Sequence, residues 1–369
     1  MIVLNPEPLD FSFLPETLPH REREIERIES IFISPVMDGL QTSLLIHGIS
    51  GTGKTATVRY VMRRHPEISF HYINSLAHTS VRSVLNEFAS GLGLVLPPGP
   101  INYSVIFRRI ASKISQQRKP VVLVIDEFSS IARADFEGIY NLLRAREVHG
   151  VSIPTVLVSL DNPLVYFKES EIRSIGNVES LKFLRYGVGE LRDIVSDRVD
   201  RAITPGACSD EVIDYIADIS EQYGSARVAI EVLQKSAYIA EYRQSAEIGI
   251  DDVRAAKSMI NPYITESKLA SLMEEDLVVL LAVCRCLVSS RYCESSCIMQ
   301  EVSVIAEDFL GSPMPASRAS GVLRKLETVG LVDSRVIGQP GDSRKVYGIS
   351  EVPVSVLSRK IISMLGKKQ

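Results

Sequence analysis

The sequence predicts an α/β domain built on a parallel sheet, followed by an all-α domain and a third domain of helices with a β-hairpin. Three observations lead to this prediction. Strand-like apolar runs alternate with helical patterns up to about residue 176, which is typical of βαβ units. A glycine-rich loop follows the first run and opens a helix. After Phe183 helical periodicity takes over, and two short strand-like runs return only after residue 330.

Size and composition indicate a globular chain. With 369 residues, 45% of them hydrophobic and 23% charged, we expect two or three domains. No apolar run reaches the roughly 18 residues that cross a bilayer, and the first residues, MIVLNPEPLDFSF, lack the basic segment of a secretion signal. We therefore expect a cytoplasmic protein with no membrane partner. Its five cysteines do not follow a zinc-binding spacing and are expected to be reduced, buried thiols.

The first domain, residues 1–182, is expected to hold four strands with helices between them. The strands are predicted at Leu44–Ile46, Ser69–Ile73, Val121–Ile125 and Thr155–Leu160. The run VVLVI at 121–125 is continuously apolar. Such runs are typical of central strands in a parallel sheet that is covered on both faces.

The loop after the first strand fits the Walker A pattern, Gly48-x-x-x-x-Gly53-Lys54-Thr55. Glycines let backbone N–H groups approach nucleotide phosphates, and the helix that follows adds its positive N-terminal end. Lys54 is expected to reach the β- and γ-phosphates of ATP, and Thr55 to ligate Mg²⁺. The predicted nucleotide-binding residues of the loop, for ATP or ADP, are Gly48, Gly51, Thr52, Gly53, Lys54, Thr55 and Ala56.

Polar residues stand at the ends of two predicted strands. Asp126 and Glu127 follow the 121–125 run as a Walker B pair, where Asp126 would hold Mg²⁺ and Glu127 would orient or deprotonate the attacking water. Asn162 follows the strand at 155–160 and is the candidate sensor of the γ-phosphate. The alternative for Asn162 is an ordinary surface turn, because Asp-Asn-Pro favours turns.

The second domain, residues 183–262, is predicted to be entirely helical. Helical periodicity covers 190–202, 210–220, 226–242 and 250–259, and Asn261-Pro262 ends it. Asp210 and Asp251 stand before two of these segments and are expected to be N-caps.

The third domain, residues 263–369, has the layout of a winged helix. Helices are expected at about 266–288, 297–309 and 316–328, followed by strands that the segment GQPGDSR joins. From 311 to 369 there are ten Lys/Arg against four Asp/Glu, a net charge of +6, whereas the whole chain carries −4. This favours DNA binding, with protein docking as the alternative. The predicted DNA-binding residues are Arg318, Arg324, Lys325, Arg335, Arg344 and Lys345.

The order of these parts resembles the archaeal replication initiators, the AAA+ relatives of eukaryotic origin recognition complex subunits and of the cell-division-control helicase loader. Their fold is an AAA+ P-loop ATPase core with a parallel sheet, an all-α lid domain and a C-terminal winged-helix domain. The resemblance covers essentially the whole chain. It is carried by LPHREREI, GISGTGKTATV, VVLVIDEF, Phe183-x-x-Tyr186 with Arg198 twelve residues on, and GSARVAIEVL.

The resemblance implies roles for several lid residues. Arg227 matches the sensor-2 arginine, which reaches the γ-phosphate, and Tyr186 and Arg198 match positions that contact the nucleotide. The stretch LPHREREI matches the segment near the adenine. Arg173 fits the arginine-finger region loosely. The stretch from Leu76 to Leu94 lacks the family's basic insertion, so the resemblance does not carry DNA contact to the ATPase domain.

The function implied is an ATP-dependent switch that binds double-stranded origin DNA and hydrolyses ATP slowly. Its expected partners are the replicative helicase of the minichromosome maintenance type and paralogous initiator subunits, and it would be nucleoid-associated. The rival interpretations are a transcriptional regulator or paralogous modulator with the same parts, and a clamp-loader-like ATPase.

Overall fold

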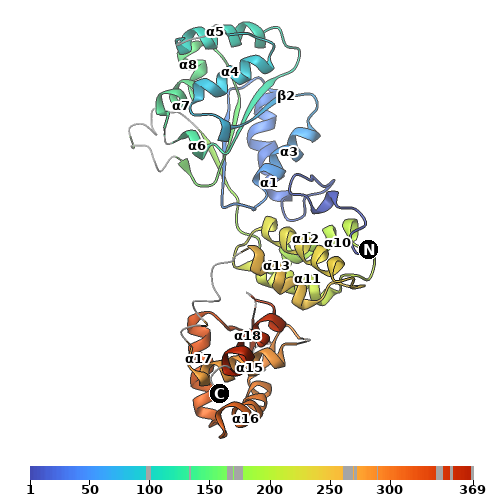
Figure 1. The fold of residues 1–369 in the computed structure, drawn as a ribbon. Coiled ribbons are helices and arrows are strands. Elements are labelled where there is room, and N and C mark those ends of the chain that lie inside the picture. Colours follow the sequence, from blue (N-terminus) through green and yellow to red (C-terminus); the bar gives the residue numbers. More distant parts are fainter. Residues whose placement is uncertain are drawn as a thin grey trace. The chain divides into compact units, whose positions relative to one another are not determined.

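The computed structural model describes residues 1–96, 101–132, 134–163, 169, 178–260, 269, 272–288, 290–337, 344–349 and 352–366. The chain divides into two compact units, shown together in Figure 1. The sheet unit comprises Leu14–Glu190 and Tyr223–Arg227, and the helical unit comprises Met1–Phe13, Leu191–Gln222 and Val228–Gln369. The predicted domain boundaries at 182 and 262 stay predictions, and residue 262 lies outside the described residues.

The sheet unit contains a five-stranded sheet in the order β2-β3-β4-β1-β5, and its strand pairs are parallel. This confirms the predicted parallel sheet. The strands are β1 (Ser43–His47), β2 (Ser69–Asn74), β3 (Val121–Asp126), β4 (Thr155–Ser159) and β5 (Glu179–Lys182). β5 was not predicted from the sequence. It is a four-residue edge strand, ESLK, whose side chains are half-buried or exposed, so it lacks an apolar run.

Helices cover both faces of this sheet because alternate strand residues point to opposite sides. Leu44, Ile46 and Val124 pack with one group of helices, whereas Leu45 and Ile125 pack with the other. The first group is α1 (Glu22–Ile28), η2 (Glu29–Ile33), α2 (Ser34–Met37) and α3 (Lys54–Arg64). The second is α4 (Val81–Gly91), α5 (Tyr103–Ile114), α6 (Ser129–Ala132), α7 (Phe136–Leu143) and α8 (Ala145–His149), with η3 (Ser75–Ala77) before it.

The helical unit begins with four helices: α10 (Val188–Ala202), α11 (Asp210–Glu221), α12 (Ala226–Tyr242) and α13 (Ile250–Ile260). The first residues of the chain, including η1 (Glu7–Leu9), belong to this unit. The carboxylate of Glu241 accepts hydrogen bonds from the backbone N–H groups of Ile2 and Val3, at 2.6 and 3.0 Å. The expected N-caps were wrong, because Ser209 caps α11 and Asp251 lies inside the first turn of α13.

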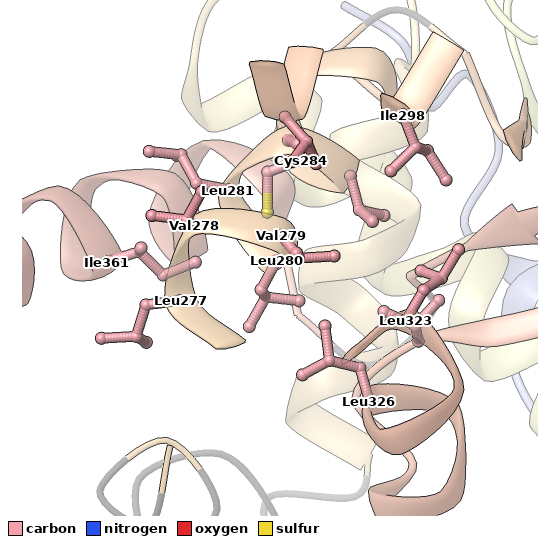
Figure 2. Close-up of a cluster of buried hydrophobic side chains, with 14 of the residues drawn as sticks. Leu277, Val278, Val279, Leu280, Leu281, Cys284, Ile298, Leu323, Leu326 and Ile361 are labelled. Carbon is pink, nitrogen blue, oxygen red and sulfur yellow. The ribbon is translucent and has the colours of Figure 1, made fainter. Parts of the chain in front are cut away.

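The winged helix follows in the same unit. It comprises α15 (Glu274–Cys286), β6 (Cys293–Glu294), α16 (Ser295–Leu310), α17 (Ala316–Val329), β7 (Asp333–Ile337), β8 (Arg344–Gly348) and α18 (Val354–Gly366). Its strands form an antiparallel sheet in the order β6-β8-β7. Figure 2 shows its core, where Leu280 of α15 lies among leucines of α17 such as Leu323 and Leu326. No helix among the described residues is long and apolar enough to span a membrane.

A buried arginine joins α13 to the winged helix. The guanidinium of Arg254 is 0% exposed and donates hydrogen bonds to the backbone carbonyls of Ile349, Leu287 and Ser290 at 3.0 to 3.1 Å. Its charge is balanced by Asp251 at 3.2 Å. A buried arginine is stable only when its donors and its charge are satisfied, so this contact fixes the winged helix on α13.

Candidate nucleotide site and nucleic-acid interface

The phosphate loop connects β1 to α3 and has room only for glycines at its bends. Gly51 and Gly53 have φ values of 78° and 88°, in the left-handed region that favours glycine. A Cβ atom on Gly53 would lie 2.6 Å from the hydroxyl oxygen of Tyr186, and one on Gly51 would overlap Ser225. Glycine is therefore required here both by the backbone conformation and by the side chains that pack against the loop.

Lys54 opens α3 and its side chain lies along the loop. The residue is 7% exposed, and its ammonium group donates to the carbonyl oxygens of Gly48 and Ile49 at 2.6 and 2.8 Å. Burial lowers the pKa of Lys54, while the nearby carboxylates of Glu127 and Asp126 act in the opposite direction. The loop thus concentrates a cation and the N-terminal end of a helix at one point, which suits a phosphate group.

The structure brings Thr55 and Asp126 together, as the predicted Mg²⁺ site requires. The Thr55 hydroxyl donates to Oδ2 of Asp126 at 2.9 Å. Asp126 is 3% exposed, and its Oδ1 accepts from the backbone N–H of Glu127 at 2.8 Å. A hydroxyl and a carboxylate side by side are oxygen ligands of the kind that Mg²⁺ prefers, so these residues fit the ion.

Glu127 stands in an unusual backbone conformation. Its φ of 56° is in the left-handed region, which costs free energy for any residue with a side chain. The hydroxyl of Ser75 holds its carbonyl oxygen at 2.8 Å. Backbone strain of this kind occurs mostly at functional sites, where the surrounding structure holds the residue in the unfavourable conformation.

Asn162 lies half-buried just beyond β4, the neighbour of β3, so it is at the same edge of the sheet as Asp126. The adjacent Asp161 accepts a hydrogen bond from Ser129 at 3.2 Å, and Ser129 also bonds Ser159 at 2.6 Å. These contacts join the segment after β4 to the segment after β3. The sensor role of Asn162 stays a prediction.

The Gly224-Ser225-Ala226-Arg227 segment contacts the phosphate loop. The N–H of Ala226 donates to the carbonyl of Gly51 at 3.0 Å, and the guanidinium of Arg227 donates to the Ser50 hydroxyl at 3.3 Å. The structure therefore places Arg227 beside the loop, as its predicted role requires. Its charge contributes to lowering the pKa of Lys54.

Five of the six predicted DNA-binding residues pair with carboxylates of the same unit. Arg318 pairs with Glu275 at 2.7 Å. The other pairs are Lys325 with Asp276, Lys345 with Glu327, Arg344 with Glu294, and Arg335 with Asp218 and Glu221. Arg324 has no ion-pair partner among the described residues and donates only to the Ser320 carbonyl, at 3.4 Å.

These ion pairs affect how the net charge of +6 at residues 311–369 is interpreted. Starting at residue 263 instead of 311, the domain carries thirteen Lys/Arg and twelve Asp/Glu, a net charge of +1. The +6 of the last segment is thus largely balanced by carboxylates that precede it. Arg335 is held by α11, at 2.9 Å from Asp218, so the structure gives it an internal partner at the predicted DNA surface.

Comparison with known proteins identifies the family. Residues 37–160 match the family described as AAA domain, and residues 192–258 match the Cdc6 AAA+ ATPase-type lid domain. A putative ORC1-type DNA replication protein 1 of Thermoplasma acidophilum is 42% identical over 347 residues, which are 94% of this chain and 99% of that protein. The chain belongs to the family of ORC1-type DNA replication proteins. The predicted resemblance to archaeal initiators is confirmed.

Solved structures of similar proteins share the fold. Cdc6p of Pyrobaculum aerophilum superimposes with a TM-score of 0.84 at 22% identity, over 100% of both chains. The ORC1 protein of Aeropyrum pernix, solved in complex with DNA, gives a TM-score of 0.61 at 23% identity, over 98% of this chain and 97% of that one. The predicted fold class, an AAA+ core with a helical lid and a winged helix, is thereby confirmed.

Two residues that the sequence analysis missed complete the site of this ORC1-type protein. The hydroxyl of Tyr72 donates to Oδ2 of Asp126 at 2.5 Å. Burial, together with that carboxylate, raises the pKa of Tyr72 to about 12. The strand register could have suggested it, because Tyr72 lies two residues before Asn74, the partner of Asp126 in the neighbouring strand.

The second missed residue is Arg21, inside LPHREREI. It is 4% exposed and donates to the carbonyls of Thr52 in the phosphate loop and of Leu184, at 2.9 and 3.1 Å. Its guanidinium also stacks on the ring of Tyr186, 3.8 Å from the ring centre. Arg21 thus ties the phosphate loop to the 183–186 segment and packs on Tyr186, for which the resemblance implied contact with the nucleotide.

Arg198 and Arg173 complete the predicted set. Arg198 lies in the helical unit, 7% exposed, with its guanidinium 4.7 Å from the ring centre of Phe13. Its Nε and one terminal nitrogen have no hydrogen-bond partner among the described residues. Burial lowers the pKa of Arg198. Arg173, the candidate arginine finger, lies outside the described residues.

Proposed function

We propose that this protein is an ATP-dependent initiator that binds double-stranded origin DNA and helps to recruit the replicative helicase. The contact of Arg227 and Ala226 with the phosphate loop carries this proposal, because these two residues also begin α12, the helix that continues into the predicted lid. A nucleotide phosphate bound at the loop would compete with Ser50 for the guanidinium of Arg227. The contacts of Arg227, at the start of α12, would therefore depend on whether nucleotide is bound. Family membership then supplies the process, DNA replication.

The proposed ligand is ATP or ADP with Mg²⁺. Lys54 would meet the β- and γ-phosphates, Thr55 and Asp126 would hold the ion, and Arg227 would approach the γ-phosphate. Tyr186 and Arg198 are proposed to contact the nucleotide from the lid side. The unpartnered nitrogens of Arg198 support this role, because a buried guanidinium without acceptors is costly and an anion would satisfy it.

The nucleotide site is tested by comparing Lys54→Ala with Lys119→Ala, an exposed lysine that bonds the Pro66 carbonyl instead. Calorimetric titration with ATP and with ADP is the measurement. We expect at least a 100-fold loss of affinity for Lys54→Ala and no change for Lys119→Ala, since a buried charged hydrogen-bond partner of phosphate contributes about 3 kcal/mol. Unchanged affinity in Lys54→Ala would refute the site.

Glu127 is proposed to activate the water that attacks the γ-phosphate, in a slow reaction that resets the switch. Glu127→Gln keeps the size of the side chain and removes its basicity. We expect ATP binding to persist while phosphate release falls by at least 100-fold. Persistent turnover in this variant would assign the base to another residue.

DNA binding is proposed to use α17 and the β7–β8 hairpin of the winged helix, the elements that enter the grooves in this class of fold. Phosphate groups would displace carboxylates from the paired arginines and lysines. Such an exchange releases fewer counterions than binding by free cations, so the salt dependence should be shallower than six phosphate contacts would give. Affinity for a labelled duplex across a series of salt concentrations measures the slope.

The remaining partners are the minichromosome maintenance type helicase and paralogous initiators, and the proposed location is the nucleoid. A winged-helix transcriptional regulator is the competing function. Footprinting of the purified protein on chromosomal fragments separates them: protection at replication origins supports initiation, whereas protection confined to promoters supports regulation.

A further inference from the structure

Three of the five cysteines meet at the start of the winged helix. Cys286 ends α15, Cys293 opens β6, and Cys297 lies in the first turn of α16. The sulfur atoms of Cys297 and Cys286 are 2.6 Å apart. The thiol of Cys293 is within hydrogen-bonding reach of Cys286 and donates to the carbonyl of Tyr347 at 3.6 Å.

The Cys286–Cys297 distance is shorter than two unbonded sulfur atoms adopt, and a covalent S–S bond of about 2.05 Å lies only slightly below it. The two residues come from helices that already pack against each other. A bond between them therefore needs only a small adjustment of the side chains. Both side chains are half-buried, so a small reagent has access to them.

The other cysteines differ in this respect. Cys284 is 0% exposed and belongs to the buried core drawn in Figure 2. Cys208 lies in the loop before α11, in another domain. Among the described residues no cluster of His, Cys, Asp or Glu has the geometry of a metal site.

We propose that Cys286 and Cys297 are a disulfide-forming site that reacts with a low-molecular-weight disulfide such as oxidised glutathione. One thiol, as thiolate, attacks a sulfur of the reagent, forms a mixed disulfide and releases one glutathione thiolate. The second thiolate attacks the protein sulfur of that mixed disulfide and releases the other. Both cysteines are oxidised, one glutathione disulfide is reduced to two thiols, and the two cysteine protons pass to the released thiolates.

Cys293 is expected to be the spectator of this pair, because its thiol donates to the carbonyl of Tyr347, whereas the sulfur atoms of Cys286 and Cys297 face each other at 2.6 Å. Burial raises the pKa of the Cys293 thiol to about 12 and also raises that of Cys286. Since the thiolate is the nucleophile, oxidation is expected to be slow near neutral pH and to accelerate as pH rises toward the thiol pKa values. The inference concerns the thiols alone and stands apart from the proposed role in replication.

The bond would staple α15 to α16, directly before the helix α17 that carries Arg318 and Arg324. A disulfide stabilises mainly by restricting the unfolded chain. For a domain of this size we expect the thermal midpoint of the winged helix to rise by about 10 °C on oxidation. The oxidised and reduced states would therefore differ in the rigidity of the proposed DNA-binding domain.

The test is peptide mapping of the full-length protein. The folded protein is equilibrated with a glutathione redox buffer, free thiols are alkylated, and the protein is digested with trypsin and a glutamate-specific protease. Cleavage after Arg285 and Arg291 isolates Cys286, and cleavage after Glu294 separates Cys293 from Cys297. We expect one linked pair, Cys286 with Cys297, with both hydrogens lost and the other three cysteines alkylated.

Matched variants decide the interpretation. Cys286→Ser and Cys297→Ser should each abolish the linked pair and the rise in thermal midpoint, whereas Cys208→Ser should retain both. Absence of the linked pair after prolonged incubation in a strongly oxidising buffer at pH 9, where more thiolate is present than at neutral pH, would overturn the proposal. A disulfide from Cys293 to Cys286 or to Cys297, formed in the same yield as the Cys286–Cys297 disulfide, would also overturn the proposal.

Discussion

Arg21 connects several separate parts of the nucleotide site. Its guanidinium bonds the phosphate loop at Thr52 and the lid-side segment at Leu184, and it stacks on Tyr186. Lysine cannot replace this planar group, because one ammonium cannot bond two carbonyls and stack on a ring together.

We therefore predict that Arg21→Lys and Arg21→Ala both weaken ATP binding and lower the free energy of unfolding by about 2–3 kcal/mol. Nucleotide titration and urea denaturation measure the two effects. Arg27→Ala, a change at a neighbouring arginine in the last turn of α1, is the control and should leave both unchanged. Unchanged ATP affinity and unfolding free energy in Arg21→Lys would show that the positive charge suffices and that the planar guanidinium is not required.

Tyr72 acts on Asp126 at the same scale. Tyr72→Phe removes the hydroxyl that holds Oδ2 at 2.5 Å and keeps the ring. Partners that orient a metal ligand typically contribute about tenfold or more to metal affinity. We expect the Mg²⁺ concentration for half-maximal ATPase to rise by about tenfold with little change in fold stability. Equal Mg²⁺ dependence in both proteins would mean that Asp126 is positioned without Tyr72.

At the scale of elements, strands with a mainly apolar sequence could be predicted and the edge strand β5 could not. β1, β3 and β4 are mainly apolar because the sheet is covered on both faces, whereas β5 reads Glu-Ser-Leu-Lys and owes its conformation to pairing with β1. The Walker residues could be predicted because loop and strand ends define them. The acids that balance Arg318 and Lys325 could not, because they lie on α15, some 43 and 49 residues away in the sequence.

These pairs on α17 give a prediction for DNA affinity. Arg324 has no carboxylate partner among the described residues, whereas Arg318 pairs with Glu275. Arg324→Ala should therefore reduce the affinity for DNA more than Arg318→Ala does. We expect about 1–3 kcal/mol for Arg324→Ala and less than half of that for Arg318→Ala. Glu275→Gln should strengthen binding. Fluorescence anisotropy with one duplex at fixed salt measures all three, and the opposite ranking would exclude this face of α17 from the interface.

The joint between α13 and the winged helix belongs to the same scale. Arg254→Leu removes the donor to the carbonyls of Leu287 and Ser290, while the carbonyl of Ile349 keeps a hydrogen bond from the Tyr215 hydroxyl at 3.0 Å. Removing one member of a buried, hydrogen-bonded set costs about 3–5 kcal/mol. We expect that loss in urea denaturation of the full-length chain, and hydrogen exchange should rise first in α13 and the segment before β6. An unaltered exchange pattern would mean that the winged helix holds its place without Arg254.

At the scale of the whole molecule, the chain combines an AAA+ phosphate loop, a segment at Ala226 and Arg227 that contacts this loop and begins α12, and a winged helix that Arg254 joins to α13. Membership of the ORC1-type family indicates DNA replication as the process in which this protein takes part. ATP binding and DNA binding would be linked because Arg227 belongs to the same chain segment as α12 of the lid.

The most direct measurement of this central claim is a genome-wide map of bound sites in cells that carry either the unchanged protein or Lys54→Ala. The account predicts that the unchanged protein gathers at sites where replication starts, and that the Lys54→Ala protein loses most of that occupancy at equal abundance. Occupancy confined to promoters, or equal occupancy in the two strains, would contradict it.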